Sequence, residues 1–317
     1  MASIAVLDDY QNVSQKFADW SSLRNQHSIR VFTAPFATPA DAAAACAPFD
    51  IICAMRERTL FDRAMLEKLP NLKLLVTTGH RNAAIDVAAA TTRGVIVSGT
   101  DAPGVATAEL AMALILGLSR HLAVEAQNMR EGRWQTTVGR DLMGRTLGLI
   151  GLGRLGGLMA KYAGAFGMPV IAWSQNLTPE AARQHGAERV EKAELFRRAD
   201  IISIHTKLSA RTTGLVGAAE LALMKPDALL INTSRGPVID EAALLAALHE
   251  GRIGGAGIDV YEPEPLSPNH PLRTAPRTLL TPHIGYVTED TYRVFYGGTV
   301  AAIRAWLDGK PIHVLTA

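Results

Sequence analysis

The sequence predicts an α/β protein with two doubly wound domains, each a parallel sheet with helices on both faces. Short apolar, β-rich runs alternate with alanine-rich helical stretches, and a long helical segment separates two such series. The chain of 317 residues is long enough for about two domains. Its hydrophobic content of 48% and charged content of 20% are those of a globular protein with a large core.

The first series occupies the N-terminal hundred residues. Strands are predicted at IAVLD, IRVFT, DIICAM, LKLLVTT and VIVSG, which are residues 4–8, 29–33, 50–55, 72–78 and 95–99. The helical stretches between them include PADAAAACA, RAMLEKL and IDVAAATTRG. The last of these ends in Arg-Gly, a pair that suits a helix C-terminus.

A loop and a long helix lead into the second series. SGTDAPG has the composition of a loop, and one helix is predicted from Val105 to Glu131, with its apolar centre LAMALILGL buried. Strands then follow at TLGLIGLG, PVIAWS, DIISIHT, ALLINTS, GGAGIDV and TLLTPH, and an amphipathic helix is predicted from Glu289 to Leu307. We assign residues 1–100 plus 288–317 to one domain and residues 101–287 to the other, with a ligand cleft expected where they join.

Composition argues against several classes of protein. No window contains the roughly 18 unbroken apolar residues of a membrane span, and acidic residues follow the N-terminus too closely for a signal or transit peptide. Cys46 and Cys53 form neither a disulfide framework nor a metal motif, and both are expected to be small buried hydrophobic residues. The net charge of +2 and the dispersed basic residues do not indicate nucleic-acid binding. A cytoplasmic protein with no metal, membrane or nucleic-acid partner is expected.

A glycine-rich turn opens the second series. LGLIGLGRLGG places Gly151, Gly153 and Gly156 in a G-x-G-x-x-G pattern between an apolar strand and a helix. The first glycine would permit a tight turn, the second would let backbone approach a pyrophosphate, and the third would let the helix pack on the strand. The pyrophosphate would sit at the positive helix N-terminus, beside Arg154 and Leu155. A glycine turn without a ligand is the alternative, but the strand–turn–helix context favours a Rossmann dinucleotide site.

Three later strands of this series end in ionisable residues. ALLINTSRG ends near Arg235, GIDVYEPEP carries Asp259, Glu262 and Glu264, and TLLTPHIGY contains His283. Ligands of open parallel sheets bind beyond the carboxyl ends of the strands, so these residues are candidates for one site. Each alone could be a solvated loop residue. Beside a dinucleotide loop in the same sheet, together they indicate an enzyme active site.

These motifs closely resemble those of the D-isomer-specific 2-hydroxyacid dehydrogenases, which include phosphoglycerate dehydrogenases, glyoxylate and hydroxypyruvate reductases and D-lactate dehydrogenases. The matching segments are GLIGLGRLG, MKPDALLINTSRGPVIDEAALLAAL, GIDVYEPEPL and TPHIG, in the family's order and spacing. Similarity at NAAIDVAAATTRGVIV, ATAELAMALILGLSR and GKPIHVL extends the resemblance to nearly the whole chain. It implies a Rossmann domain, a flavodoxin-like substrate domain, and hydride transfer between NAD(H) or NADP(H) and a 2-keto acid or D-2-hydroxy acid.

The resemblance also implies roles for the ionisable residues. Arg235 would pair with the substrate carboxylate and polarise the 2-keto group, which suits a planar bidentate donor. His283 would protonate the forming alkoxide, and Glu264 would hold its imidazole. Asp259 would lie near the nicotinamide carboxamide, whereas Glu262 is interpreted as an exposed loop acid.

The loop TTGHRNAAID in the first domain matches a family loop whose backbone N–H groups help bind the substrate carboxylate. Gly79 and His80 occupy the matching place. Small residues usually follow the glycine, but this chain has His80, Arg81 and Asn82. Either these side chains point to solvent, or they form a cationic pocket that suits a substrate with a second hydroxyl or acidic group.

Several further cofactor contacts are assigned by resemblance. Thr107 would face the cofactor cleft from the start of the long helix, and His205 and Thr212 would flank the cofactor phosphates. Thr233, at the end of ALLINTS, is a further candidate. Lys207 stands where the family usually has proline.

The stretch VIAWSQN bears on the choice between NAD(H) and NADP(H). NAD-preferring relatives place an aspartate where this chain has Ser174, followed by Gln175 and Asn176. These side chains can donate hydrogen bonds to a ribose hydroxyl or to a 2′-phosphate. The missing acid removes the repulsion against a 2′-phosphate, but the arginine of a dedicated NADP site is missing too. The preference is unresolved, with a slight lean towards acceptance of NADPH.

The resemblance also predicts a homodimer, and two other functions remain open. REGRWQ with Trp134 matches an arm that enters a dimer partner, so a homodimer through residues 105–142 is expected, and an ordinary core anchor is the alternative for Trp134. A dinucleotide-sensing binding protein, like the family's corepressor relatives, and a phosphite-type dehydrogenase are the rival functions. The sequence does not specify which 2-hydroxy acid is the substrate.

Overall fold

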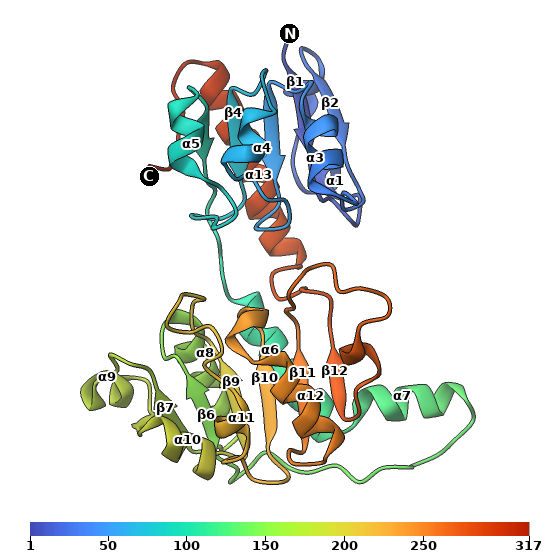
Figure 1. Cartoon of the computed structure of the whole chain (residues 1–317), viewed down its shortest axis with the longest axis vertical. Helices are drawn as coiled ribbons and strands as arrows, with labels where there is room; N and C mark the ends of the chain where they lie inside the picture. The colour runs from blue at the N-terminus through green and yellow to red at the C-terminus, as the bar shows by residue number, and fades with distance from the viewer. Residues whose placement is uncertain (317) are drawn as a thin grey trace. The chain divides into compact units, whose positions relative to one another are not determined.

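The chain folds into two compact α/β units, seen in the computed structural model of Figure 1, which describes residues 1–316. Unit 1 comprises residues 1–103 and 287–316, and unit 2 comprises Gly104–Tyr286. Each unit contains one sheet whose strands are all parallel, which confirms the predicted fold class. Unit 1 is discontinuous in sequence because the last helix returns to it.

The sheet of unit 1 has the strand order β2-β1-β3-β4-β5. Every residue of β3 and β4 is buried, as expected for central strands covered on both faces. The strands are β1 (Ser3–Val6), β2 (Ser28–Val31), β3 (Ile51–Ala54), β4 (Leu74–Thr77) and β5 (Ile96–Ser98).

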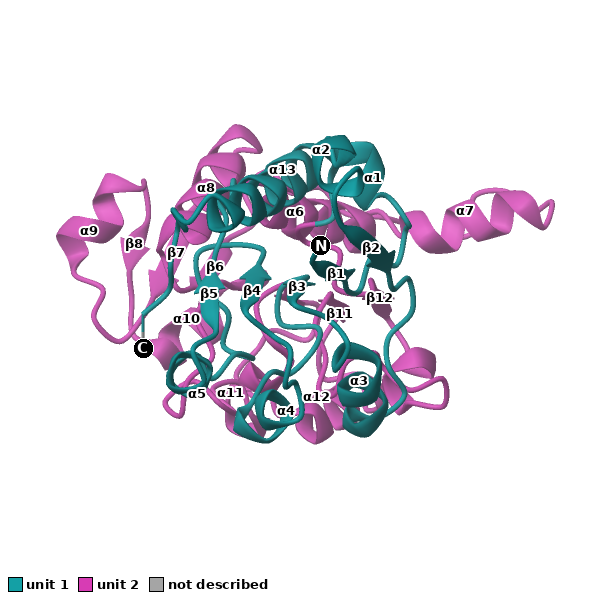
Figure 2. Cartoon of the chain, turned by 90° about the horizontal axis from the view of Figure 1, so that it is seen from above, with its two compact units in different colours: residues 1–103, 287–317 teal, residues 104–286 magenta. Residues whose placement is uncertain are grey.

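Helices cover both faces of this sheet (Figure 2). One face carries α3 (Pro39–Cys46), α4 (Arg63–Glu67) and α5 (Val87–Thr92), and the other carries α1 (Ser14–Phe17), α2 (Ser21–Arg24) and α13 (Glu289–Leu307). Thr38, Asp62 and Asp86 cap α3, α4 and α5 by accepting hydrogen bonds from backbone N–H groups of the first turn. Cys46 and Cys53 are free and buried, as the sequence predicts.

The chain returns to the edge of this sheet after α13. The Leu315 N–H donates to the Val97 carbonyl at 2.8 Å, and the Gly99 N–H donates to the His313 carbonyl at 2.9 Å. The Leu315 side chain packs against the core beneath α3, α4 and α5. The final segment therefore completes the β5 edge.

The sheet of unit 2 has the strand order β12-β11-β10-β9-β6-β7-β8. The direction of winding reverses between β6 and β9, and such a reversal point is where open α/β sheets bind ligands. The strands are β6 (Leu147–Ile150), β7 (Val170–Trp173), β8 (Glu188–Arg189), β9 (Ile201–Ile204), β10 (Leu229–Asn232), β11 (Gly255–Ile258) and β12 (Thr278–Leu280).

Two apolar clusters fill the two faces of this sheet. One cluster lies beneath α6 (Ala106–Ser119) and α8 (Arg154–Ala165), with α9 (Pro179–Gln184) at its edge. The other lies beneath α10 (Lys192–Arg198), α11 (Ala218–Leu221) and α12 (Glu241–His249). Two short 3₁₀ turns, Gly236–Val238 and Pro271–Thr274, complete the unit.

The single helix predicted from Val105 to Glu131 is wrong. Two helices occupy this stretch, α6 and α7 (Leu122–Arg130), and their axes differ by 63°. His121 between them has φ +51°, a left-handed conformation that interrupts the helical hydrogen-bond ladder. α6 is buried in the core, whereas α7 projects from unit 2 (Figure 1). The join contains neither glycine nor proline, so the sequence pattern could not reveal it.

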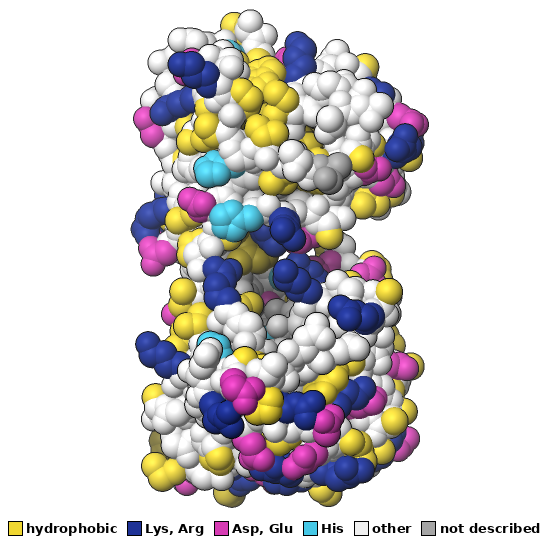
Figure 3. Space-filling model, turned by 90° about the vertical axis from the view of Figure 1, so that its left-hand side faces the viewer, with side chains coloured by type: hydrophobic (Ala, Val, Ile, Leu, Met, Phe, Trp, Pro, Cys, Tyr) yellow, Lys and Arg dark blue, Asp and Glu magenta, His cyan; other side chains and the backbone are white. Residues whose placement is uncertain are grey.

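The surface of unit 2 carries charges of both signs. Lys and Arg side chains alternate with Asp and Glu over the lower part of the face in Figure 3. Ion pairs on the surface of this unit include Arg198 with Glu188 and Arg183 with Glu180. Among the described residues no single helix is both long and apolar enough to cross a membrane, and only the bent pair of α6 and α7 reaches that composition together.

Candidate active site

The glycine turn joins β6 to α8 and leaves room for a ligand. Gly151 has φ +94°, and a Cβ atom there would lie 2.7 Å from the His205 carbonyl oxygen. A Cβ atom on Gly156 would collide with the Gly151 carbonyl, whereas one on Gly153 would meet no atom within 4 Å. Gly153 is the N-cap of α8 and has no side chain to accept a hydrogen bond from the first turn. The turn therefore fits a pyrophosphate bound to backbone N–H groups.

Arg154 and Leu155 begin α8 and differ in their surroundings. Leu155 is half-buried and packs against the core beneath α6 and α8. The Arg154 guanidinium lies directly against Gly104, because a Cβ atom on that glycine would overlap it. Gly104 has φ +67°, a conformation that also favours glycine.

The end of β7 carries no acidic group. Ser174 is partly buried, and its carbonyl accepts a hydrogen bond from the Leu177 N–H at 3.1 Å. This bond closes a turn whose tip carries the exposed residues Gln175 and Asn176. The position where an aspartate would hold an adenosine ribose is therefore occupied by a hydroxyl.

The threonines assigned to the cofactor occupy three different environments. The Thr233 hydroxyl, just after β10, is buried and has no hydrogen-bond partner within residues 1–316. The Thr212 hydroxyl donates to the Lys207 carbonyl at 2.7 Å and so holds its own loop together. The Thr107 hydroxyl donates to the Gly285 carbonyl at 2.9 Å. The unpartnered Thr233 hydroxyl is a polar group that a bound dinucleotide could satisfy.

Asp259, just after β11, holds the segment that follows β12. Its carboxylate is almost fully buried and accepts hydrogen bonds from the Thr281 hydroxyl at 2.6 Å and from the N–H groups of Ile284 and Gly285 at 2.9 Å each. Burial raises the pKa of this carboxyl, and the Thr281 hydrogen bond opposes that shift. Asp259 therefore anchors the segment that carries His283.

His283 and Glu264 form a close pair at the carboxyl edge of the sheet. His283 Nδ1 lies 2.5 Å from Glu264 Oε2. The other carboxylate oxygen of Glu264 accepts a hydrogen bond from the Tyr261 N–H at 2.8 Å, which fixes the carboxylate. Because Nδ1 faces Glu264, Nε2 is the nitrogen left to face a substrate. His283 has φ +54°, an uncommon conformation of the kind that occurs at functional sites.

Arg235 follows β10, the strand next to β11. Its carbonyl accepts a hydrogen bond from the Asn232 side-chain amide at 2.9 Å, and its guanidinium donates to the Ser234 carbonyl at 2.7 Å. A Cβ atom on Gly236 would come within 2.5 Å of the Tyr261 backbone, so the turns after β10 and β11 are in contact. The guanidinium, the carboxylate and the imidazole therefore follow three adjacent strands. Glu262 is exposed, as the sequence predicts.

The glycine turn and these strand ends lie within the part of the chain that matches a known family. Residues 112–285 match the family model described as D-isomer specific 2-hydroxyacid dehydrogenase, NAD binding domain. The chain belongs to this family.

Curated relatives and a solved structure agree with this membership. The dehydrogenase is 42% identical to a glyoxylate reductase of Thermococcus litoralis over 243 residues, which cover 72% of each chain. It is 39% identical to a D-3-phosphoglycerate dehydrogenase of Methanocaldococcus jannaschii over 79% of this chain and 48% of that protein. A phosphoglycerate oxidoreductase from Vibrio cholerae superposes with a TM-score of 0.92 at 35% identity, over 98% of this chain and all of that one. The expected class, an NAD(H)- or NADP(H)-dependent oxidoreductase of 2-hydroxy acids, is confirmed.

The loop that the resemblance assigns to the substrate differs from the expectation at Gly79 and Asn82, whereas the exposure of His80 and Arg81 agrees with the alternative that they point to solvent. The Gly79 N–H donates to the Thr100 hydroxyl at 2.8 Å, so it is already engaged within unit 1. Asn82 is buried, and its amide donates to the Arg56 carbonyl at 2.6 Å and to the Thr77 hydroxyl at 2.8 Å. Asn82 therefore shapes the loop. His80 and Arg81 are exposed.

Arg56 is a candidate residue that sequence reasoning missed. Its guanidinium donates to the Thr78 carbonyl at 2.8 Å and occupies the space beside Gly79. Arg56 has φ +50°, which is uncommon for arginine. It follows β3 as Gly79 follows β4, and these strands are neighbours, so an arginine just after a predicted strand was the available signal.

His205 is held by its neighbours at the end of β9. The imidazole Nε2 lies 2.8 Å from the hydroxyl of the buried Ser203. The backbone N–H of His205 donates to the Ile150 carbonyl at 2.8 Å. Burial lowers the pKa of His205 to about 4, so the imidazole is neutral at physiological pH. Within residues 1–316, no three His, Cys, Asp or Glu side chains are grouped so that they could hold a metal ion.

We expect His205→Asn to reduce the acid sensitivity of the fold. The unfolded chain binds a proton near the usual histidine pKa of 6.5, whereas the folded chain does so only near 4. The stabilising contribution is therefore complete above pH 6.5 and is lost as the pH falls towards 4. Between about pH 7.5 and about pH 5, the wild type should lose about 1 to 2 kcal/mol more unfolding free energy than the variant. Urea unfolding at both pH values measures this, and equal losses would contradict it.

Proposed function

We propose that the dehydrogenase reduces a small 2-keto acid to a D-2-hydroxy acid, with Arg235, His283 and Glu264 as its catalytic residues. The observation that carries this proposal is the 2.5 Å contact between His283 Nδ1 and Glu264, which orients Nε2 as a proton donor at the strand ends where Arg235 also lies.

Each of the three residues has a distinct role in the proposed reaction. A nicotinamide cofactor, when bound, would supply the hydride for the carbonyl carbon, and the residues would handle the proton and the charge. His283 Nε2 donates the proton that neutralises the developing alkoxide, and it takes the proton back in the reverse direction. The Arg235 guanidinium pairs with the substrate carboxylate through two parallel hydrogen bonds and polarises the keto oxygen. Glu264 holds the imidazole through Nδ1 and keeps its orientation fixed.

The cofactor would be held by residues of unit 2. The N–H groups at the start of α8 would receive the pyrophosphate above Gly153, where no side chain intrudes. Ser174 would receive the adenosine ribose, and the buried Thr233 hydroxyl would gain a hydrogen-bond partner. Asp259 retains its anchoring hydrogen bonds to Ile284 and Gly285 in this arrangement.

The substrate is proposed to be a keto acid with a small polar or acidic second group. The relatives are glyoxylate reductases and phosphoglycerate dehydrogenases, whose names refer to such compounds. The loops after β3 and β4 of unit 1 carry Arg56, His80 and Arg81, which suit an anionic or hydroxylated ligand. Two free cysteines support the proposal of a reducing, cytoplasmic location.

A substrate panel tests this function. Glyoxylate, hydroxypyruvate, pyruvate and phenylpyruvate are each added to the purified protein with NADH and with NADPH. Oxidation of reduced cofactor should be fastest with glyoxylate or hydroxypyruvate, and the product should be the D isomer wherever it is chiral. Cofactor binding without turnover of any keto acid would instead favour a dinucleotide-sensing protein. Reduction of NAD⁺ or NADP⁺ by phosphite would favour the phosphite-type enzyme.

We also propose that the dehydrogenase is a homodimer whose interface is formed by α7 and the arm after it. This segment exposes apolar side chains that a monomer would leave in water. Trp134 is 72% exposed and Val138 is 91% exposed, and Leu122, Val124 and Met129 of α7 are each at least half exposed. Since large aromatic residues dominate protein interfaces, Trp134 is the strongest candidate anchor.

The double substitution Trp134→Ser and Val138→Ser is expected to convert the dimer to monomer. Removing two apolar side chains from the centre of a modest interface weakens it by about 100-fold or more. Sedimentation velocity across a protein concentration series measures the change. Leu60→Ser, which removes a similarly exposed side chain from unit 1, is the control and should leave the dimer intact. A monomeric wild type would contradict the proposal.

A further inference from the structure

We propose that Arg189 of β8 and Ser174 after β7 form a subsite for the 2′-phosphate of NADP(H). This subsite presupposes the dinucleotide function proposed above and adds a cofactor preference to it. The description of the family model names NAD, and the names of the relatives specify neither NAD(H) nor NADP(H).

The first element of the subsite is the hydroxyl at the end of β7. A carboxylate at this position would accept hydrogen bonds from ribose hydroxyls and repel a 2′-phosphate. Ser174 removes that repulsion and can donate one hydrogen bond to a phosphate oxygen. Gln175 and Asn176 at the exposed turn tip add amide donors, but neither carries a positive charge. A phosphate at this place therefore needs a cation from another element.

Arg189 is the cation that the sheet register brings to this place. β8 pairs with β7 in parallel, with Arg189 opposite Ala172, and the Val190 N–H donates to the Ala172 carbonyl at 3.0 Å. Ser174 lies two residues beyond Ala172. With strand spacing of about 4.8 Å and a rise of about 3.3 Å per residue, the Cα atoms of Arg189 and Ser174 are about 8 Å apart. An extended arginine side chain can reach a group bound at Ser174 over that separation.

The Arg189 side chain is directed towards the required edge of the sheet. Residues paired across parallel strands point to the same face, so Arg189 shares the face of Ala172, which packs in the cluster beneath α6 and α8. Its guanidinium forms an ion pair with Glu191, two residues further along and beyond the end of β8. Because Glu191 lies past the strand end, the guanidinium points to the carboxyl edge, where Ser174 also lies.

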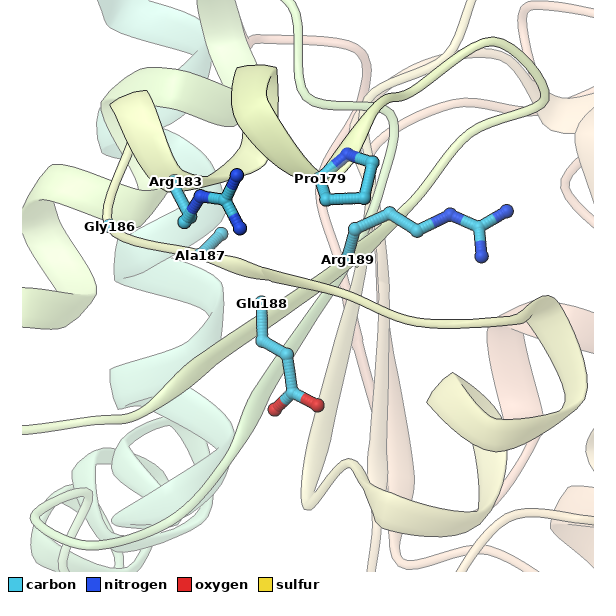
Figure 4. Close-up of a pocket in the computed structure, with 6 residues that line it drawn as sticks. All are labelled: Pro179, Arg183, Gly186, Ala187, Glu188 and Arg189. Carbon is cyan, nitrogen blue, oxygen red and sulfur yellow. The ribbon is translucent and has the colours of Figure 1, made fainter.

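Arg189 can exchange its present partner for a phosphate. The Glu191 side chain is 69% exposed, and such exposed ion pairs are weak. A phosphate dianion offers the guanidinium two oxygens in the geometry that it binds best. The Arg189 stem lines an open hollow of about 500 Å³ beside Pro179, so the side chain has space to move (Figure 4).

Neighbouring cations and acids do not change this assignment. Lys192 donates to Glu220 at 2.8 Å and to the Leu215 carbonyl, which holds it on the opposite face of the sheet. Arg183 of α9 forms an equally exposed ion pair with Glu180, but it lies on a helix, and no strand pairing places it beside the end of β7. Arg189 is therefore chosen for its position, because the register of β7 and β8 places it beside Ser174.

Binding of two nucleotide fragments tests the subsite without any turnover. Adenosine 2′,5′-bisphosphate carries the 2′-phosphate and 5′-AMP lacks it, and calorimetry measures both affinities. The wild type should bind the bisphosphate more tightly than 5′-AMP. Arg189→Ala should weaken the bisphosphate about tenfold, as expected for one charge-assisted contact near solvent, and should leave 5′-AMP within about twofold. Glu191→Gln removes the competing carboxylate and should tighten the bisphosphate.

Arg183→Ala is the matched control, because it removes a neighbouring arginine that also lines the hollow. It should leave both affinities unchanged. If 5′-AMP binds but Arg189→Ala does not weaken the bisphosphate, the subsite is refuted while the dinucleotide function stands. If neither fragment and neither reduced dinucleotide binds the wild type, the proposed function itself fails. Thermal unfolding of each variant confirms that it is folded.

Discussion

Replacing His283 by asparagine is expected to lower kcat for keto-acid reduction by about a thousandfold. The variant loses the group that protonates the alkoxide, and a general acid of this kind contributes about 10²- to 10⁴-fold. Asparagine is the suitable replacement because His283 has φ +54°, a conformation that asparagine adopts more readily than most residues. The backbone of the segment anchored by Asp259 is thereby preserved.

Steady-state oxidation of the reduced cofactor measures this loss, and calorimetry shows whether cofactor affinity stays within about twofold of the wild type. The control is Glu262→Gln, which neutralises an exposed acid of the neighbouring turn and should leave kcat unchanged. A kcat within about tenfold of the wild type in His283→Asn would mean that another group supplies the proton.

Replacing Arg235 by lysine is expected to lower kcat/KM by about 10²- to 10³-fold, chiefly through a higher KM for the keto acid. Lysine keeps the positive charge but cannot form two parallel hydrogen bonds to a carboxylate. The substrate would also lose the orientation that places its keto oxygen beside His283. Because lysine preserves the charge, a large effect would show that the planar guanidinium, with its two parallel N–H donors, is the essential property.

The keto-acid concentration series that gives kcat and KM separates the two contributions. Arg273→Lys is a matched control, since Arg273 donates to backbone carbonyls in the turn after β11 and is not part of the proposed site. Near-normal kcat/KM in Arg235→Lys would show that charge alone binds the carboxylate, and normal values in Arg235→Ala would remove Arg235 from the mechanism.

The β-α alternation identified the parallel sheets because the central strands are apolar on both faces and short enough to be recognised between helices, whereas the edge strand β8 consists of Glu188 and Arg189 and was not predicted. The ionisable residues were found for a local reason, since Arg235 directly follows a predicted strand, His283 ends another, and Glu264 lies in the turn after a third. The pairing of His283 with Glu264, at 2.5 Å, could only be inferred through family resemblance. The two residues are nineteen positions apart in the sequence, and strand β12 lies between them.

Other features depend on contacts that no local pattern records. The break at His121 has no glycine or proline, and the helical periodicity on both sides suggested one continuous helix. Asp259 was expected to lie near the nicotinamide, but its anchoring of Ile284 and Gly285 depends on the neighbouring position of β11 and β12. The use of the Gly79 N–H by Thr100 likewise depends on tertiary structure, since the two residues follow adjacent strands.

The discontinuity of unit 1 has a consequence for the order of folding during synthesis. Domains generally fold as units, and the N-terminal one usually folds first as the chain leaves the ribosome. Here the first hundred residues emerge without α13, which covers one face of their sheet, and without Leu315, which seals the β5 edge. Unit 2 is complete in the nascent chain once Tyr286 has emerged, whereas unit 1 must wait for nearly thirty more residues. The nucleotide-binding half is therefore expected to fold first, while the N-terminal half depends on chaperones or on partial structure until α13 and Leu315 have been synthesised.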